Sequence, residues 1–276
     1  KVLPDIALIT NAVSSHLEKL KSKGKVAEEK SYILKHLKEN GTAILPRDSE
    51  FYSYWKERCG TKRIITFGSN ENSDIFLSNI ETNFSKDQIS FNLNSPQKTI
   101  HCVMNGIAIH NSMNACSALA VCFALNIDLE KISKTLRNVV YPSRRMEVHK
   151  ALRGALVIDD SYNANPDSMK KSLDVLGDLT DKKRIFIAGE MAELGKDQVY
   201  YHEKICKYAD GKVEEFLCIG KLWKEGLSHI PKIGKSFSSK VELLDYINTN
   251  ISKESIILVK GSRSTGMDFI ADELKV

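Results

Sequence analysis

The chain has 276 residues, of which 42% are hydrophobic and 27% are charged, as in an ordinary globular protein. At roughly 100 to 200 residues per domain, this length favours two domains. The net charge of +5 comes from 40 basic and 35 acidic residues mixed along the chain, which argues against a nucleic-acid-binding surface. No apolar run approaches the ~20 residues that cross a membrane. We therefore expect neither nucleic-acid binding nor membrane insertion.

The six cysteines show no spacing typical of a metal site or a disulfide framework. Several lie in apolar runs, as Cys122 does, where a thiol packs as a small hydrophobic group. We therefore expect reduced thiols in a cytoplasmic protein, and no signal peptide is visible. The chain begins with a lysine and enters an apolar segment almost at once, so we expect it to start inside a domain.

The first part of the chain predicts an α/β domain with an antiparallel extension. An apolar strand over residues 5–10 is followed by His16, then by a helix from Val26 that ends near Asn40-Gly41. Four of the next predicted strands lie between turn-forming stretches, at residues 63–67, 74–77, 88–93 and 99–103. Residues 88–93 alternate polar and apolar side chains, which indicates a half-exposed antiparallel strand. We expect a small antiparallel sheet attached to a mainly parallel one.

A strongly apolar helix is predicted over residues 111–125. Asn111 and Asn114 are three residues apart and share a face at its amino end. A capping role would explain Asn111 without a ligand, but it does not explain Asn114. After a further helix at residues 129–136, Tyr141-Pro142-Ser143 reads as a linker. We place the domain boundary there, giving domains of residues 1–141 and 142–276.

From residue 154 onward strands and helices alternate, which predicts a doubly wound parallel sheet. Right-handed crossovers then bring the turns after the strands to one edge. These turns are residues 160–165, 189–195, 220–221 and 260–263. Lys260 and Arg263 beside a helix start would suit an anionic ligand.

The segment Asp159-Asp-Ser-Tyr-Asn-Ala-Asn-Pro166 carries more polar groups than a turn needs. Pro166 fits the first helical position and Asn165 fits the N-cap, so a well-formed turn is the simplest alternative to a binding site. Neither G-x-G-x-x-G nor G-x-x-x-x-G-K-[ST] occurs in the chain. If a nucleotide binds, these residues do not include the usual phosphate loop.

Seven segments together match one known family. They are Ile9-Thr-Asn11 with His16-Leu17, Ala27-Glu-Glu-Lys30, His110-Asn-Ser-Met-Asn-Ala115, Ser143-Arg-Arg-Met-Glu147, Ile158-Asp-Asp-Ser-Tyr-Asn-Ala-Asn-Pro-Asp-Ser-Met169, Gly189-Glu-Met-Ala-Glu-Leu-Gly195 and Val259-Lys-Gly-Ser-Arg263. With them the chain resembles the bacterial Mur ligases. The fifth and seventh segments are typical of the branch that joins D-alanyl-D-alanine to UDP-N-acetylmuramoyl-tripeptide. The others are shared with sister ligases and folylpolyglutamate synthases, and Glu190 stands where aspartate is the more common residue.

The resemblance implies a three-domain enzyme of which residues 1–141 are most of the central ATPase domain and residues 142–276 a Rossmann-like carboxyl-terminal domain. It places the UDP-sugar-binding domain and the phosphate loop upstream of Lys1, so we expect the chain alone to be inactive. The implied reaction is amide formation driven by ATP and Mg²⁺, through an acyl phosphate that the amine of the dipeptide attacks. We expect a monomer.

The resemblance also assigns residues. His16 and Lys30, the latter carbamylated by CO₂, would be catalytic and hold Mg²⁺, whereas pattern alone makes Lys30 a solvated helix residue. Two further groups would contact ATP (Asn111, Asn114, Arg145, Asp160, Tyr162) and the substrates (Asn163, Asn165, Lys260, Ser262, Arg263). The alternatives are a non-catalytic nucleotide- or peptide-binding module and a folylpolyglutamate synthase-like ligase.

Overall fold

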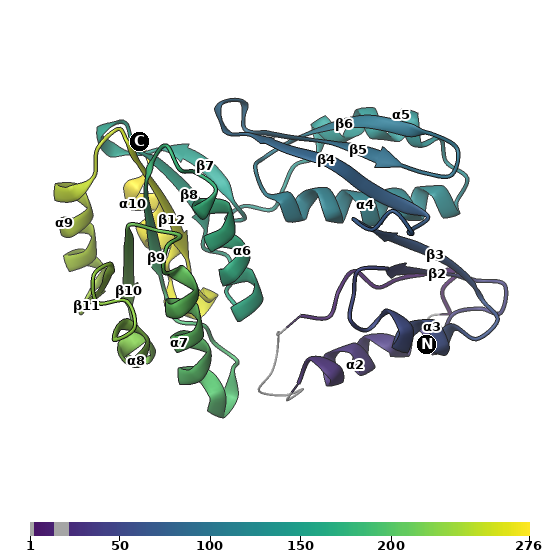
Figure 1. The fold of residues 1–276 in the computed structure, drawn as a ribbon, viewed down its shortest axis with the longest axis horizontal. Helices are drawn as coiled ribbons and strands as arrows, with labels where there is room; N and C mark the ends of the chain where they lie inside the picture. Colours follow the sequence, from purple (N-terminus) through teal and green to yellow (C-terminus); the bar gives the residue numbers. More distant parts are fainter. Residues whose placement is uncertain (1–2, 14–21) are drawn as a thin grey trace. The chain divides into compact units, whose positions relative to one another are not determined.

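The computed structural model describes residues 3–13 and 22–276, apart from the side chain of residue 85. These residues form two compact units that divide between Val140 and Tyr141 (Figure 1). Each unit has its own six-stranded sheet. The expected mixed α/β architecture with two mostly parallel sheets is confirmed.

The sheet of the first unit runs in the order β1-β2-β3-β4-β5-β6. Its strands are β1 (Ile6–Leu8), β2 (Thr42–Pro46), β3 (Arg63–Gly68), β4 (Ile75–Asn83), β5 (Gln88–Asn94) and β6 (Thr99–Asn105). Strands β1 to β4 pair in parallel, and β4, β5 and β6 pair antiparallel. The antiparallel strands therefore continue the parallel sheet. Along β5 buried and partly exposed residues alternate strictly, as expected.

Helices cover both faces of the parallel part of this sheet. They are α2 (Lys23–Lys35), α3 (Tyr52–Cys59) and α4 (Ile109–Ala124), whereas α5 (Leu129–Ser133) packs against α4 and β6. Ala43 and Leu45 of β2 pack with α2 and α3 in one core that includes Trp55. Side chains alternate along a strand, so Ile44 faces the other side of the sheet, and all five residues of β2 are buried. Helix α3 had no clear sequence signal, because its eight residues are mostly polar or aromatic.

The sheet of the second unit runs in the order β11-β10-β9-β12-β8-β7. Its strands are β7 (Glu147–Lys150), β8 (Leu156–Asp160), β9 (Lys183–Ala188), β10 (Glu215–Ile219), β11 (Gly234–Phe237) and β12 (Ser255–Lys260). All pair in parallel except β7, which is antiparallel to β8. The two edge strands, β7 and β11, were not predicted, because each has only four residues and no fully buried one.

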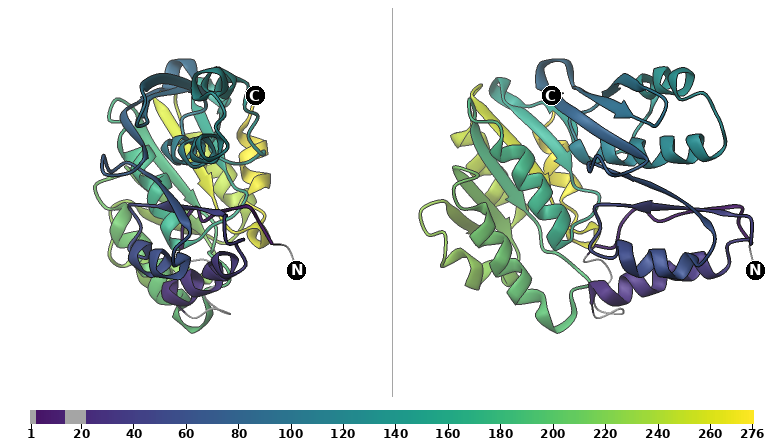
Figure 2. Two further views of the ribbon diagram at one scale, coloured as in Figure 1. Left: turned by 90° about the vertical axis from the view of Figure 1, so that its right-hand side faces the viewer. Right: turned by 45° about the vertical axis from the view of Figure 1, so that its right-hand side comes forward.

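The helices of the second unit lie on both faces of its sheet (Figure 1, Figure 2). They are α6 (Pro166–Gly177), α7 (Gln198–Ala209), α8 (Lys224–Leu227), α9 (Lys240–Asn250) and α10 (Asp268–Leu274). Helices α9 and α10 share a core with alternate residues of the central strands, such as Ile185 and Ile257. Because β9, β12 and β8 are adjacent and parallel, the turns that follow them meet at one edge.

All six cysteines are free thiols, and only Cys122 is not fully buried. Burial raises the pKa of Cys102 to about 11 and those of Cys116 and Cys206 to about 12. Since the thiolate is the reactive form, these three residues are inert packing groups at neutral pH. Within residues 3–13 and 22–276, none of the helices combines the length and the apolar character that crossing a membrane requires.

Candidate functional site

Three turns of the second unit are joined through one buried hydroxyl. Ser262, which is 2% exposed, accepts a hydrogen bond at its Oγ from the backbone N–H of Ala192 (2.8 Å) and donates from it to the carbonyl of Ala164 (3.3 Å). Its own N–H donates to the carbonyl of Glu190 (3.0 Å). The turns after β8, β9 and β12 are thus fastened together at the carboxyl ends of their strands, where parallel α/β sheets bind ligands.

Lys260 and Asp160 form a buried ion pair in the same region. Lys260 is 3% exposed, and its Nζ donates to Asp160 Oδ2 (2.6 Å) and to the carbonyl of Asn163 (3.1 Å). Ser172 of α6 donates to the same carboxylate oxygen (2.8 Å). The lysine expected to face an anionic ligand is therefore neutralised within the protein. The hydrogen bonds of Lys260 hold the turn after β8 against β12.

Tyr162 carries the exposed chemistry of this edge. Its ring has the Arg145 guanidinium carbon at 4.3 Å from its centroid and that of Arg263 at 5.7 Å. Arg145 and Arg263 are exposed, and Tyr162 is 39% exposed. One guanidinium group can donate two parallel hydrogen bonds to a phosphate or a carboxylate, and it also stacks on planar rings. Two such groups beside one phenol ring can neutralise a multiply charged anion.

The two asparagines of this turn differ in their roles. Asn165 caps α6 as predicted: its Oδ1 accepts from the N–H of Ser168 (2.9 Å), and its own N–H donates to Ser168 Oγ (3.0 Å). Asn163 is exposed, and its Oδ1 accepts from the N–H of Ala164 (2.9 Å). Of the two, Asn163 is the one that solvent reaches freely.

The turn after β9 is supported by contacts that the sequence did not predict. Glu190 Oε1 accepts from the N–H of Leu222 (2.9 Å), so this residue reaches the turn after β10. Beneath the same turn, His202 Nε2 accepts from the N–H of Met191 (2.9 Å) while Nδ1 lies 2.7 Å from the carbonyl of Gln198. These partners require a neutral ring with its proton on Nδ1. Burial lowers the pKa of His202, which favours that form. A lone histidine in an amphipathic helix gave no signal of this role.

In the first unit, the amino end of α4 corrects one expectation. The helix begins at Ile109, with Ala108 as its N-cap, and the N–H of Asn111 donates to the carbonyl of Ala108 (2.8 Å). Capping therefore does not explain Asn111, and that alternative is wrong. Asn111 is 9% exposed and Asn114 is exposed. Both remain candidates for a ligand.

The expected metal-binding residues are only partly described. Lys30 lies in α2, half-buried, and burial lowers its pKa. His16 lies outside the described residues. Among residues 3–13 and 22–276, no group of three His, Cys, Asp or Glu side chains could hold a metal ion.

Comparison with known proteins settles the family. The Mur ligase middle domain matches residues 1–122, and the Mur ligase glutamate ligase domain matches residues 144–263. The chain belongs to the Mur ligase family. It is 37% identical, over 98% of its length, to a UDP-N-acetylmuramoyl-tripeptide–D-alanyl-D-alanine ligase of Buchnera aphidicola subsp. Baizongia pistaciae, and 30% identical over 99% to one of Escherichia coli.

A crystal structure of MurF from Acinetobacter baumannii superposes on this Mur ligase with a TM-score of 0.90 and 28% identity, covering 99% of the chain. The chain spans 59% of the Buchnera relative, 60% of the E. coli relative and 60% of the Acinetobacter chain.

Proposed function

We propose that this chain belongs to an ATP-dependent ligase that joins D-alanyl-D-alanine to UDP-N-acetylmuramoyl-tripeptide. Relatives of that name match nearly its whole length. The main structural support for the proposal is the cluster of Arg145, Tyr162 and Arg263 at the carboxyl edge of the sheet. We further propose that the enzyme works in the cytoplasm, in keeping with its free thiols, and that it is a monomer.

In this reaction the tripeptide carboxylate attacks the γ-phosphorus of ATP, and ADP leaves. The dipeptide amine then attacks the carbonyl carbon of the acyl phosphate, and inorganic phosphate departs as the amide forms. Such chemistry depends mainly on positioning and charge neutralisation. Arg145 would neutralise the phosphates of ATP beside Tyr162. Asp160 would face the ribose, from a largely buried position beside Lys260.

For Asn111 and Asn114 of the first unit, the proposed contact is the adenine or ribose of ATP. The proposed substrate contacts at the carboxyl edge of the sheet of the second unit are Asn163, Asn165, Lys260, Ser262 and Arg263. Asn163 and Arg263 are the exposed members of this group. The hydrogen bonds of Asn165, Lys260 and Ser262 within the protein favour an indirect contribution from these three, through the shape of the turns.

The proposal includes Lys30 as a carbamate. A neutral amine can attack the carbon of CO₂, forming an N–C bond and releasing a proton, and the half-buried position of Lys30 with its lowered pKa favours the neutral amine. The product is an anionic oxygen ligand, as a hard cation prefers. Together with His16 it would hold Mg²⁺, which neutralises phosphate charge when bound.

Replacing Lys30 tests this modification. In protein expressed from the whole open reading frame, Lys30→Ala should lower kcat at least tenfold, because an anionic ligand is lost. Formate or acetate should restore part of the rate by supplying a small carboxylate. Lys35→Ala, a change to an exposed lysine at the end of the same helix, is the matched control. An unchanged rate in Lys30→Ala would reject the carbamate.

The reaction itself is tested with the same protein. Phosphate release from ATP should require both UDP-N-acetylmuramoyl-tripeptide and D-alanyl-D-alanine, and the product mass should equal their sum less one water. Glutamate addition to folate would assign the protein to the folylpolyglutamate branch instead. Nucleotide binding without turnover of any of these substrates would indicate a binding module.

A further inference from the structure

Arg144 and Arg145 are neighbours with opposite environments. Arg145 is exposed and stacks on Tyr162. The Arg144 side chain is 28% exposed, and its Nη2 donates to Asp272 Oδ2 of α10 (2.9 Å). The charge of Arg145 is thus exposed, whereas the charge of Arg144 is paired with Asp272.

The backbone on both sides of Arg145 is in a left-handed conformation. Arg144 has φ 63° and Met146 has φ 57°. Non-glycine residues rarely adopt this conformation, and such strain persists where the surroundings impose it, often at functional sites. Here the N–H of Arg144 donates to Glu147 Oε2 (3.1 Å), and its carbonyl accepts from the N–H of Tyr162 (3.1 Å). The strained segment is therefore bonded directly to the residue on which Arg145 stacks.

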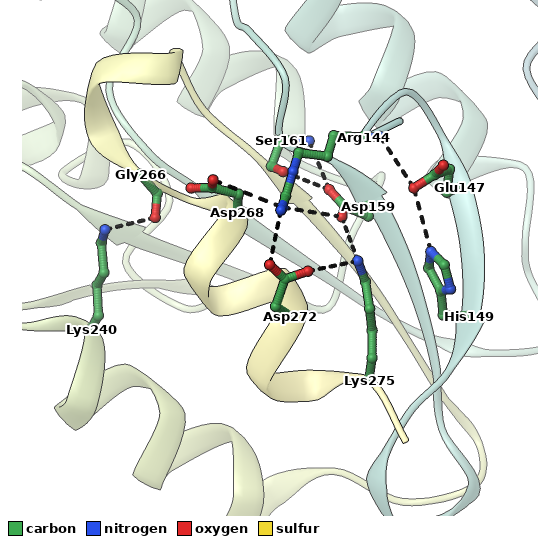
Figure 3. A network of polar contacts seen from close by, with 10 residues as sticks. All are labelled: Arg144, Glu147, His149, Asp159, Ser161, Lys240, Gly266, Asp268, Asp272 and Lys275. Atoms are coloured by element: carbon green, nitrogen blue, oxygen red, sulfur yellow. Dashed lines mark hydrogen bonds and ion pairs between the residues drawn. The ribbon is translucent and has the colours of Figure 1, made fainter. Parts of the chain in front are cut away.

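Asp159 is the buried centre of the surrounding network (Figure 3). It is 0% exposed. Its Oδ1 accepts from the N–H (3.1 Å) and the hydroxyl (2.6 Å) of Ser161, and its Oδ2 accepts from Lys275 Nζ (2.7 Å). Arg144 Nη1 lies 3.8 Å from the same Oδ2. Lys275 also donates to Asp272 Oδ1 (2.9 Å), so the charges of Arg144, Asp159, Asp272 and Lys275 form one connected group.

We propose that this group, Arg144, Asp159, Asp272 and Lys275, positions Arg145 over Tyr162 for the phosphates of the nucleotide. Asp159 is then a positioning residue, whereas its neighbour Asp160 pairs with Lys260 and takes no part in this group. The inference rests on the proposed function, because it takes Arg145 as a phosphate ligand. It adds that α10 and the adjoining Lys275 help to set the position of the Arg145 guanidinium.

A double-mutant cycle in protein from the whole open reading frame tests this. Arg145→Ala should raise the KM for ATP about tenfold or more, as loss of a hydrogen bond to a charged group predicts. Asp159→Asn should raise it by a similar factor with a smaller change in kcat. The double variant should resemble either single variant, because Asp159 acts only through Arg145 and such effects are not additive.

Three further variants keep the test independent of folding. Asp272→Asn removes a contact from a side chain that is 49% exposed, and it should reproduce part of the KM effect in a protein that folds. Lys275→Arg preserves the charge and should retain near-normal KM. Glu273→Gln changes an exposed carboxylate of the same helix and should leave the KM for ATP unchanged.

The outcomes separate the inference from the proposed function. The positioning role would be overturned if the increases in the KM for ATP multiplied when Arg145→Ala was combined with Asp159→Asn or with Asp272→Asn. Arg145 would still be a phosphate ligand in that case. A normal KM for ATP in Arg145→Ala would reject both that ligand and the network that serves it. If Asp159→Asn lowered the melting temperature but left the KM for ATP unchanged, the contacts of Asp159 would be purely structural.

Discussion

Asp159 and Asp160 are adjacent at the end of β8, yet they serve different faces of the sheet. Asp159 binds Lys275 and lies near Arg144, on the side of α10. Asp160 binds Lys260 and accepts from Ser172 of α6. This division follows from the alternation of side chains along a strand. The paired carboxylates therefore attach one strand end to two different helices.

Removing the partner of Asp160 should be costly. Lys260→Met leaves a carboxylate that is almost fully buried without its cation, which typically lowers the free energy of unfolding by about 3–5 kcal/mol. Urea unfolding of the second unit measures the change, and Lys253→Met, at a lysine whose side chain is 81% exposed, is the control. Adding Asp160→Asn to Lys260→Met should recover a large part of the loss, since no unpaired charge remains. Equal stability of both lysine variants would contradict this account.

His202 should make stability depend on pH. Burial holds its pKa below the ordinary value of 6.5, so below that pH the unfolded chain binds more protons than the folded one. The stabilisation is complete above pH 6.5 and falls as the pH drops toward the folded pKa. Urea unfolding at pH 8 and 5.5, followed by Trp223 fluorescence in a Trp55→Phe background, should show this loss.

The matched comparison for this pH effect uses two further variants in the same background. His202→Gln should lower stability at pH 8 but show a flatter pH dependence between 8 and 5.5. His101→Gln, at an exposed histidine of the first unit, should keep the full dependence. The explanation fails if His202→Gln and the parent lose the same free energy on acidification.

At the scale of elements, the cap of α6 could be predicted from the sequence because all the residues that form it are close together in the chain. Asn165, Pro166 and Ser168 lie within four residues and form the capping box directly. The prediction that Asn111 could cap α4 failed for the opposite reason. The helix begins two residues earlier, at Ile109, after a buried Ala108 that has no side-chain cap. Tertiary burial of Ile107 and Ala108 outweighed the local capping preference there.

The capping role of Asn165 predicts a stability effect without a ligand effect. Asn165→Ala should lower the free energy of unfolding by about 1 kcal/mol, because an orphan backbone donor loses its acceptor. Asn165→Asp preserves the acceptor and should remain near the parent value. Thermal denaturation measures the difference, and the KM for ATP is recorded in parallel. A large KM change in Asn165→Asp at normal stability would instead assign this side chain to the ligand.

For the whole molecule, the sequence predicted both sheets, their mostly parallel order and the edge at which the turns gather. It did not predict which polar residues neutralise each other. Lys260 and Asp160 are 100 residues apart, and Asp159 and Lys275 are 116 apart, so no local pattern relates them. Pairing of this kind depends on strand order and helix placement, which periodicity alone does not determine.

Among the described residues, each unit has an apolar core of its own, which predicts that the second unit folds alone. The apolar cluster that β8, β9, β10, β12, α9 and α10 share contains only residues after position 150. The first unit has its own cluster around Trp55. A fragment of residues 141–276 should therefore unfold cooperatively in urea, with Trp223 as its single tryptophan reporter. Its midpoint should match that of the same unit in the longer chain. A fragment without a cooperative transition would refute the independence of this core.

The contact between Glu190 and Gly220 has a consequence for substitutions at the two positions. A Cβ at Gly220 would lie 2.3 Å from the Glu190 side chain, and Gly220 itself has φ 123°, a conformation that favours glycine whatever stands at 190. The dependence is therefore one-sided: this glycine can persist beside a shorter side chain, but Glu190 would have to leave its present conformation if any other residue stood at position 220. A side chain at position 220 would therefore also break the hydrogen bond that Glu190 Oε1 accepts from Leu222.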